Sequence, residues 1–151
     1  MKKELNKNTI DAETAKKPLE IFMVEDNATD IKLAEIAFRD TAVSNNFSVV
    51  MDGYEALEFL HQRGAYTTAR KPDLVLLDLN LPKISGLEVL ATMMNDPKLS
   101  DIPVAIMTAS ESDKDIQTST SLNAKFFVQK PVDFGRFIEM IDRMKTGGFM
   151  L

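Results

Sequence analysis

The chain has 151 residues, of which 44% are hydrophobic, and its formal net charge is −5. This length is enough for one domain with a hydrophobic core, and the negative charge argues against a nucleic-acid surface as the main function. The absence of cysteine excludes disulfides and favours a reducing compartment. No apolar run approaches the roughly 20 residues of a membrane span, and the polar N-terminus lacks the centre of a signal peptide. We therefore expect a soluble cytoplasmic protein.

The hydrophobic pattern predicts five strands that alternate with five helices between a polar leader (1–17) and a short tail (147–151). Short connections and right-handed crossovers then favour an α/β fold with a doubly wound parallel sheet. The predicted strands are 19–24, 47–51, the apolar run that ends at Asp78, 104–107 and 125–128. The predicted helices are about 28–42, one around 56–60, one that starts at Gly86, 112–122 and 132–145.

The third predicted strand is the most informative stretch of the chain. Leu74 to Leu77 are apolar without a break, and the run stops at the carboxylate of Asp78. Such a run fits a strand buried on both faces of a parallel sheet, and ligands bind at the carboxyl ends of strands in such sheets. Alone, Asp78 could equally be a residue that turns the chain.

Three other predicted strands also end in chemically useful residues, namely Glu25-Asp26, Thr108 and Lys130. Three carboxylates at one edge repel one another unless a cation binds or a proton is retained. A site that offers only oxygen ligands, without His or Cys, favours Mg²⁺. Asp78 is then a candidate nucleophile that forms an aspartyl phosphate. The metal and Lys130 would neutralise the transferred group, and Thr108 could donate a hydrogen bond to it. The alternative is a set of unrelated caps and surface ion pairs.

The chain resembles the receiver domain of two-component response regulators over about residues 19–145. The resemblance implies a flavodoxin-like sheet with strand order 2-1-3-4-5. It rests on four motifs at predicted strand ends, namely Val24-Glu25-Asp26-Asn27, Leu77-Asp78-Leu79-Asn80-Leu81-Pro82, Met107-Thr108-Ala109-Ser110 and Val128-Gln129-Lys130-Pro131.

The resemblance implies that a histidine kinase transfers a phosphoryl group to Asp78. Asp26 and Asp78 would ligate Mg²⁺ together with the main-chain carbonyl of Asn80, and Glu25 would act partly through water. Lys130 would pair with the phosphoryl group.

Further features are implied around this site. The peptide bond before Pro131 would be cis, and Thr108 and Phe127 would form a two-state switch. The chain departs from the family pattern at Ser85-Gly86, where Asp usually precedes the glycine; we expect this to alter a turn and not the site.

Within the family, residues 60–66 and the run Leu79-Asn80-Leu81-Pro82 resemble small stand-alone receivers that partner bacterial phytochromes. Too few residues follow Lys145 to fold an output domain, so we expect output through contact with another chain. The predicted surface runs from the helix at 112–122 to the C-terminus and would form a homodimer or dock the kinase.

We expect a signalling switch that is not an enzyme, apart from catalysing its own phosphorylation and slow dephosphorylation. Two other classes of function compete with this interpretation. A phosphatase of the haloacid-dehalogenase type needs a general acid two residues after its nucleophile, and Asn80 cannot supply the proton. A flavodoxin-like cofactor binder needs a loop after the first strand that holds phosphate. Glu25-Asp26 would repel phosphate there without a metal.

Overall fold

The protein folds around one sheet of five parallel strands in the order β2-β1-β3-β4-β5. This computed structural model describes residues 17–109, 118, 122, 124 and 126–146. The strand order and the doubly wound architecture predicted from the sequence are confirmed. The strands are β1 (Leu19–Val24), β2 (Asn45–Val50), β3 (Leu74–Asp78), β4 (Val104–Thr108) and β5 (Phe126–Gln129).

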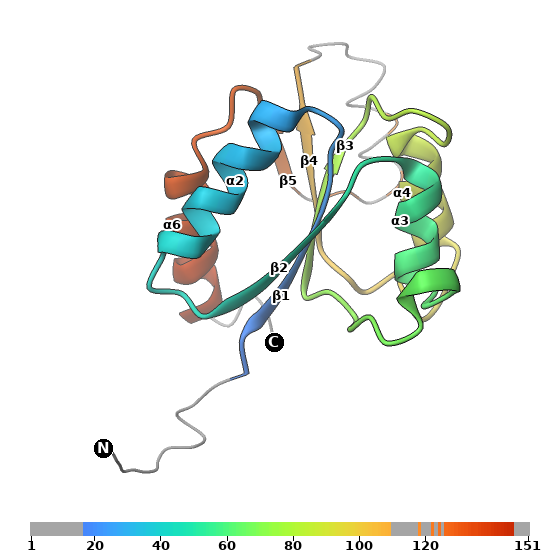
Figure 1. Cartoon of the computed structure of the whole chain (residues 1–151), viewed down its shortest axis with the longest axis horizontal. Helices are drawn as coiled ribbons and strands as arrows, with labels where there is room; N and C mark the ends of the chain where they lie inside the picture. Colours follow the sequence, from blue (N-terminus) through green and yellow to red (C-terminus); the bar gives the residue numbers. More distant parts are fainter. Residues whose placement is uncertain (1–16, 110–117, 119–121, 123, 125, 147–151) are drawn as a thin grey trace.

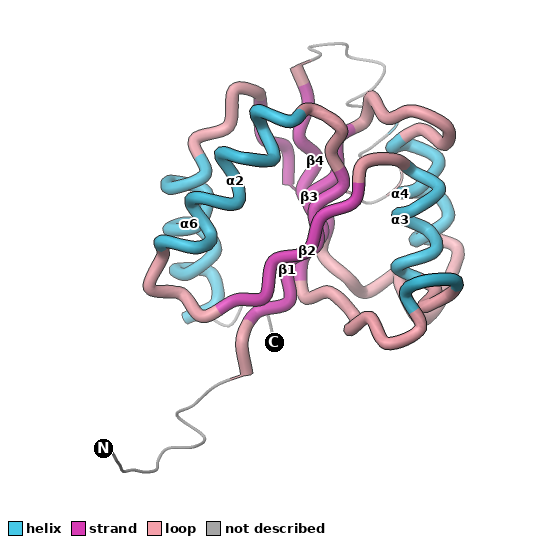
Figure 2. The backbone as a smooth tube through the Cα atoms, in the orientation of Figure 1, coloured by secondary structure: helices cyan, strands magenta, loops and turns pink. Residues whose placement is uncertain are grey.

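Helices cover both faces of the sheet. Helices α2 and α6 lie on one face, and α3 and α4 lie on the other (Figure 1, Figure 2). Their bounds, with those of the short 3₁₀ helix η1, are α2 (Ala28–Asp40), α3 (Gly53–Leu60), η1 (Gly64–Tyr66), α4 (Gly86–Met94) and α6 (Phe134–Thr146). The helix predicted at 112–122 lies almost wholly outside the described residues, as do most of the predicted leader and the tail at 147–151. Within the described part of the chain, every helix is too short or too polar to cross a bilayer.

Strand β3 separates two hydrophobic cores, and all five of its residues are buried. Val75 and Leu77 pack into the core beneath α3 and α4, whereas Leu74 and Leu76 pack into the core beneath α2 and α6. Side chains alternate between faces along a strand, so a central strand with helices on both sides must be apolar at every position. The unbroken apolar run is explained by this position in the sheet.

Two helix starts follow from side-chain capping. Ser85, where the family usually has Asp, accepts a hydrogen bond from the Glu88 N–H, and the Glu88 side chain accepts one from the Ser85 N–H. This capping box fixes the start of α4. The Asp133 side chain accepts a hydrogen bond from the Arg136 N–H, which fits a start of α6 at Phe134, two residues later than predicted.

The link between α3 and β3 contributes Tyr66 to a small aromatic cluster. The ring of Tyr66 in η1 packs on Phe59, with ring centres 5.4 Å apart, and Phe59 stacks on Phe22 at 4.0 Å. The Tyr66 hydroxyl also donates a hydrogen bond to Glu55. These contacts fasten the link to α3.

Two loops meet at the carboxyl edge of the sheet. The N–H of Gly53, at the start of α3, donates a 3.4 Å hydrogen bond to the Pro82 carbonyl. A Cβ at Gly53 would overlap the carbonyl group of Ile84. Lys83 adopts φ 67° and its Nζ lies 3.4 Å from Asp52 Oδ2. The loop that follows Asp78 is therefore held against the start of α3.

We predict that Gly53→Ala lowers the free energy of unfolding by about 1–3 kcal/mol, because the added methyl group forces the two loops apart. Gly135→Ala is the matched control: its added Cβ meets no atom closer than 3.4 Å, and alanine favours a helix over glycine. Urea unfolding followed by circular dichroism measures both. Equal stability of Gly53→Ala and wild type would contradict the close approach.

Candidate functional site

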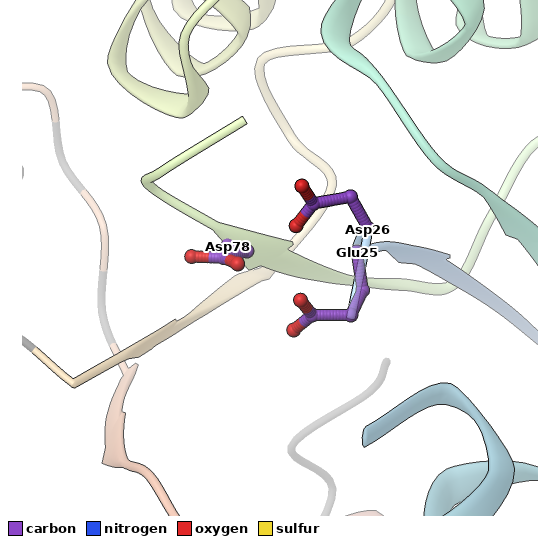
Figure 3. A group of neighbouring side chains, drawn as sticks. All are labelled: Glu25, Asp26 and Asp78. Carbon is purple, nitrogen blue, oxygen red and sulfur yellow. The ribbon is translucent and has the colours of Figure 1, made fainter. Parts of the chain in front are cut away.

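Three carboxylates gather at the carboxyl edge of the sheet (Figure 3). Glu25 and Asp26 directly follow β1, and Asp78 ends β3, the strand that pairs with β1. One oxygen of each carboxylate lies within 4.8 Å of the others. Glu25 is fully buried and Asp78 is 4% exposed, whereas Asp26 is exposed to solvent. Two of the three negative charges are therefore largely removed from water.

Lys130 supplies the positive charge at this edge. Its Nζ lies 2.7 Å from Glu25 Oε1, 3.1 Å from Asp78 Oδ2 and 3.2 Å from Asp30 Oδ2. The Lys130 N–H donates a 3.0 Å hydrogen bond to the Thr108 carbonyl, which fixes the residue beside the end of β4. From there its long side chain reaches across to the ends of β1 and β3. The Lys130–Pro131 peptide bond is cis.

Asp30 was missing from the sequence-based site. The predicted site residues follow the ends of strands, whereas Asp30 lies in the first turn of α2. An acidic residue there is commonly explained by the helix dipole, so its sequence position carried no separate signal. The Asn27 side chain accepts a 2.9 Å hydrogen bond from the Asp30 N–H, and this cap orients the first turn toward Lys130.

Two of the remaining predicted residues, Asn80 and Thr108, contact Asp78 and Lys130, respectively. The Asn80 N–H donates a 3.0 Å hydrogen bond to Asp78 Oδ1. Thr108 is buried at the end of β4. Phe127 is 41% exposed on β5, so it is not an ordinary core residue.

Burial dominates the electrostatics of Glu25. It raises the pKa of this carboxyl group to about 7; contact with Lys130 opposes the rise, and the nearby Asp78 adds to it. The Asn27 N–H also lowers the Glu25 pKa through a 3.1 Å hydrogen bond to Oε2. Burial alone would lower the pKa of Lys130, but its contacts with Glu25 and Asp78 outweigh burial and raise that pKa.

One buried oxygen remains without a hydrogen bond. Glu25 Oε1 forms an ion pair with Lys130 that lacks hydrogen-bond angles, and it accepts no hydrogen bond from the described residues. A buried carboxylate oxygen of this kind suits a cation ligand. The donor set contains oxygen alone, which matches hard divalent cations. The residues present therefore fit a divalent metal ion.

We predict that the metal-free protein loses stability as pH rises from about 4.5 to about 7. The folded-state pKa of Glu25 is about 7 against an ordinary value of 4.5, so folding opposes its ionisation and the penalty is complete only above the folded-state pKa. The expected fall in unfolding free energy is of the order of 1–3 kcal/mol.

Urea unfolding in EDTA across this pH range measures the loss of stability. The Glu25→Gln variant, which has no proton to lose at this position, is the control and should show a smaller fall. A rise in wild-type stability over the same range would contradict the burial of an ionisable Glu25.

The fold and this site define a class of protein. The chain matches the response regulator receiver domain family over residues 21–142. It belongs to that family, whose general function is to accept a phosphoryl group in two-component signalling.

Individual relatives support the same assignment. Response regulator Rcp1 of Synechocystis sp. is 33% identical over 129 residues, which cover 85% of this chain and 88% of the relative. The crystal structure of the phosphorylated cyanobacterial phytochrome response regulator RcpA is 38% identical, with a TM-score of 0.76 and coverage of 85% of this chain and 92% of that one. The Mn²⁺-bound structure of Rcp1 is 32% identical, with a TM-score of 0.75 and coverage of 85% of this chain and 93% of that one.

Proposed function

We propose that this chain accepts a phosphoryl group from a histidine kinase on Asp78. The supporting observation is the position of this buried carboxylate at the end of the central strand, 3.1 Å from Lys130 Nζ. An Asp78 oxygen attacks the phosphorus of a phosphohistidine, the nitrogen–phosphorus bond breaks, and its electron pair stays on the imidazole. Lys130 stabilises the negative charge of the transferred group.

We propose Mg²⁺ as the cofactor, held by Glu25, Asp26, Asp78 and the main-chain carbonyl of Asn80. The oxygen-only carboxylate group and the unsatisfied Glu25 Oε1 support a divalent cation, and the relative Rcp1 is known in a Mn²⁺-bound form. The bound ion would neutralise charge on the phosphoryl oxygens. The carboxylates of this chain would otherwise repel the incoming dianion.

The partner we propose is a phytochrome-type kinase. The resemblance to stand-alone receivers and the likeness to the phytochrome response regulator RcpA support this choice. Comparison of phosphotransfer rates from phytochrome-type and other histidine kinases tests it, and faster transfer from unrelated kinases would count against it.

The predicted homodimer or kinase-docking surface stays a prediction, because the helix predicted at 112–122 and the tail at 147–151 lie largely outside the described residues. Sedimentation of the unphosphorylated and the phosphorylated protein, each with and without residues 146–151, tests the dimer, and a monomer in all four samples would remove it.

We predict that Asp78→Asn abolishes labelling by a phosphorylated histidine kinase or by acetyl phosphate, because the amide cannot act as the nucleophile. Asp101→Asn is the control, since Asp101 is exposed and pairs with Lys71 at 3.2 Å. Radiolabel transfer followed by mass spectrometry gives the site. Undiminished label in Asp78→Asn would place the acceptor elsewhere.

We predict that Asp26→Asn weakens Mg²⁺ binding by about tenfold or more, because it removes one charged ligand. The chain contains no tryptophan, so calorimetric titration is a better readout than intrinsic fluorescence. Asp101→Asn again controls for the loss of one negative charge. Equal affinity of Asp26→Asn and wild type would contradict the ligand assignment, and phosphorylation in excess EDTA would contradict the metal requirement.

We propose that Thr108 and Phe127 form the switch that transmits phosphorylation. Thr108 is buried at the end of β4, and Phe127 on the adjacent β5 pairs with Ile106 and is partly exposed. Movement of the Thr108 hydroxyl toward the phosphoryl group would leave space for the Phe127 ring. Phosphorylation shifts this equilibrium only through its different interaction with the two states.

We predict that Thr108→Ala is still phosphorylated but shows reduced chemical-shift changes at Phe127, because the side chain that links phosphate to ring is missing. Phosphorylation-dependent NMR spectra of wild type and variant provide the measurement. The same shifts at Phe127 in both proteins would rule out Thr108 as the link.

A further inference from the structure

Among the described residues, Asp30 is the one carboxylate that contacts Lys130 without belonging to the group suited to the metal. Its Oδ2 lies 3.2 Å from Lys130 Nζ, while the metal-suited group consists of Glu25, Asp26 and Asp78. The Asp30 side chain is 22% exposed and that of Lys130 is 15% exposed. Ion pairs shielded to this degree are screened less by salt than pairs on an open surface.

Local structure holds Asp30 in this position. The Asn27 N–H donates a hydrogen bond to Glu25 Oε2, and the Asn27 side chain accepts one from the Asp30 N–H. The short segment between the end of β1 and the first turn of α2 is thus fixed at both ends. Asp30 Oδ2 and Glu25 Oε1 therefore contact the same ammonium group.

Cation binding changes the balance of charge around Lys130. A divalent ion held by Glu25, Asp26 and Asp78 reduces their attraction for the ammonium group, because opposite charge then lies beside them. Asp30 is outside that group and keeps its full attraction for Lys130. A phosphoryl group that arrives on Asp78 must therefore share Lys130 with Asp30.

We propose that Asp30 is a positioning residue that competes with the phosphoryl group for Lys130 and so disfavours the phosphorylated state. This inference rests on the proposed function, since it requires phosphorylation of Asp78. The Lys130–Asp30 ion pair is present in the unphosphorylated protein, and the phosphorylated protein can form its own Lys130–phosphoryl contact only by weakening that pair. Asp30 would thereby shift the equilibrium without touching the reacting atoms.

The test compares Asp30→Asn with Glu35→Gln. Glu35 lies on the same helix and is exposed, so its variant makes the same change in net charge away from Lys130. The probe is beryllofluoride with Mg²⁺, a non-covalent mimic of a phosphoryl group on a carboxylate. NMR titration up to millimolar concentrations keeps weak binding measurable. We expect about fivefold tighter binding in Asp30→Asn, the effect of one partly shielded ion pair.

Two further variants separate competition from a general effect of charge or folding. Asp30→Glu restores the carboxylate and should return the affinity toward the wild-type value. In a Lys130→Gln background, Asp30→Asn should change the affinity less than twofold, because no ammonium group remains to compete for. Thermal unfolding of each variant shows whether the fold is retained.

The outcomes distinguish this inference from the proposed function. If wild type neither binds beryllofluoride at Asp78 nor is labelled there, the proposed function is wrong. If wild type binds but Asp30→Asn binds equally or more weakly, only the competition is overturned. Tighter binding that persists in the Lys130→Gln background also overturns it, since Asp30 would then act by simple repulsion.

Discussion

The burial of Glu25 and Asp78 next to each other is the constraint on which the site depends. Two adjacent carboxylates inside a protein are unfavourable unless positive charge or protons compensate them. In the described structure, Lys130 contacts both groups at once. Its single charge cannot balance both carboxylates: burial raises the pKa of Glu25 to about 7, and the nearby Asp78 adds to the rise, even though Lys130 Nζ lies 2.7 Å from Glu25 Oε1. The site is thereby prepared for a cation.

The parallel sheet is what places the carboxylates of Glu25 and Asp78 next to each other. Strands β1 and β3 are neighbours and run in the same direction, so their carboxyl ends bring Glu25 and Asp78 together. The apolar residues of β3 pack into both cores. This packing fixes the strand that ends at Asp78. The loop after it is held by contacts between Gly53 and residues 82–84. The scaffold of sheet and loops therefore holds the buried charges of Glu25 and Asp78 next to each other.

Much of the fold could be predicted from the sequence because its signals are local. β1 and the buried β3 ended where the apolar pattern placed them, and the strand-end residues Glu25, Asp78 and Lys130 meet at one edge. Boundaries of helices were less certain because they depend on capping side chains such as Ser85 and Asp133. The packing of Tyr66, in the link between α3 and β3, on an aromatic stack was not indicated by the sequence pattern.

The sequence by itself determined the α/β class, the order of strands and helices among the described residues, and the strand-end carboxylates that point to cation and phosphoryl chemistry. Periodicity and strand-end position carry that information along the chain. Only the tertiary structure decided which residues share Lys130. Asp30 lies 100 residues away from Lys130 in the sequence and contacts its ammonium group because α2 starts shortly after β1, at the edge of the sheet that the Lys130 side chain also reaches. The partial exposure of Phe127 was likewise settled by packing around β5, since a residue's type does not reveal what covers it.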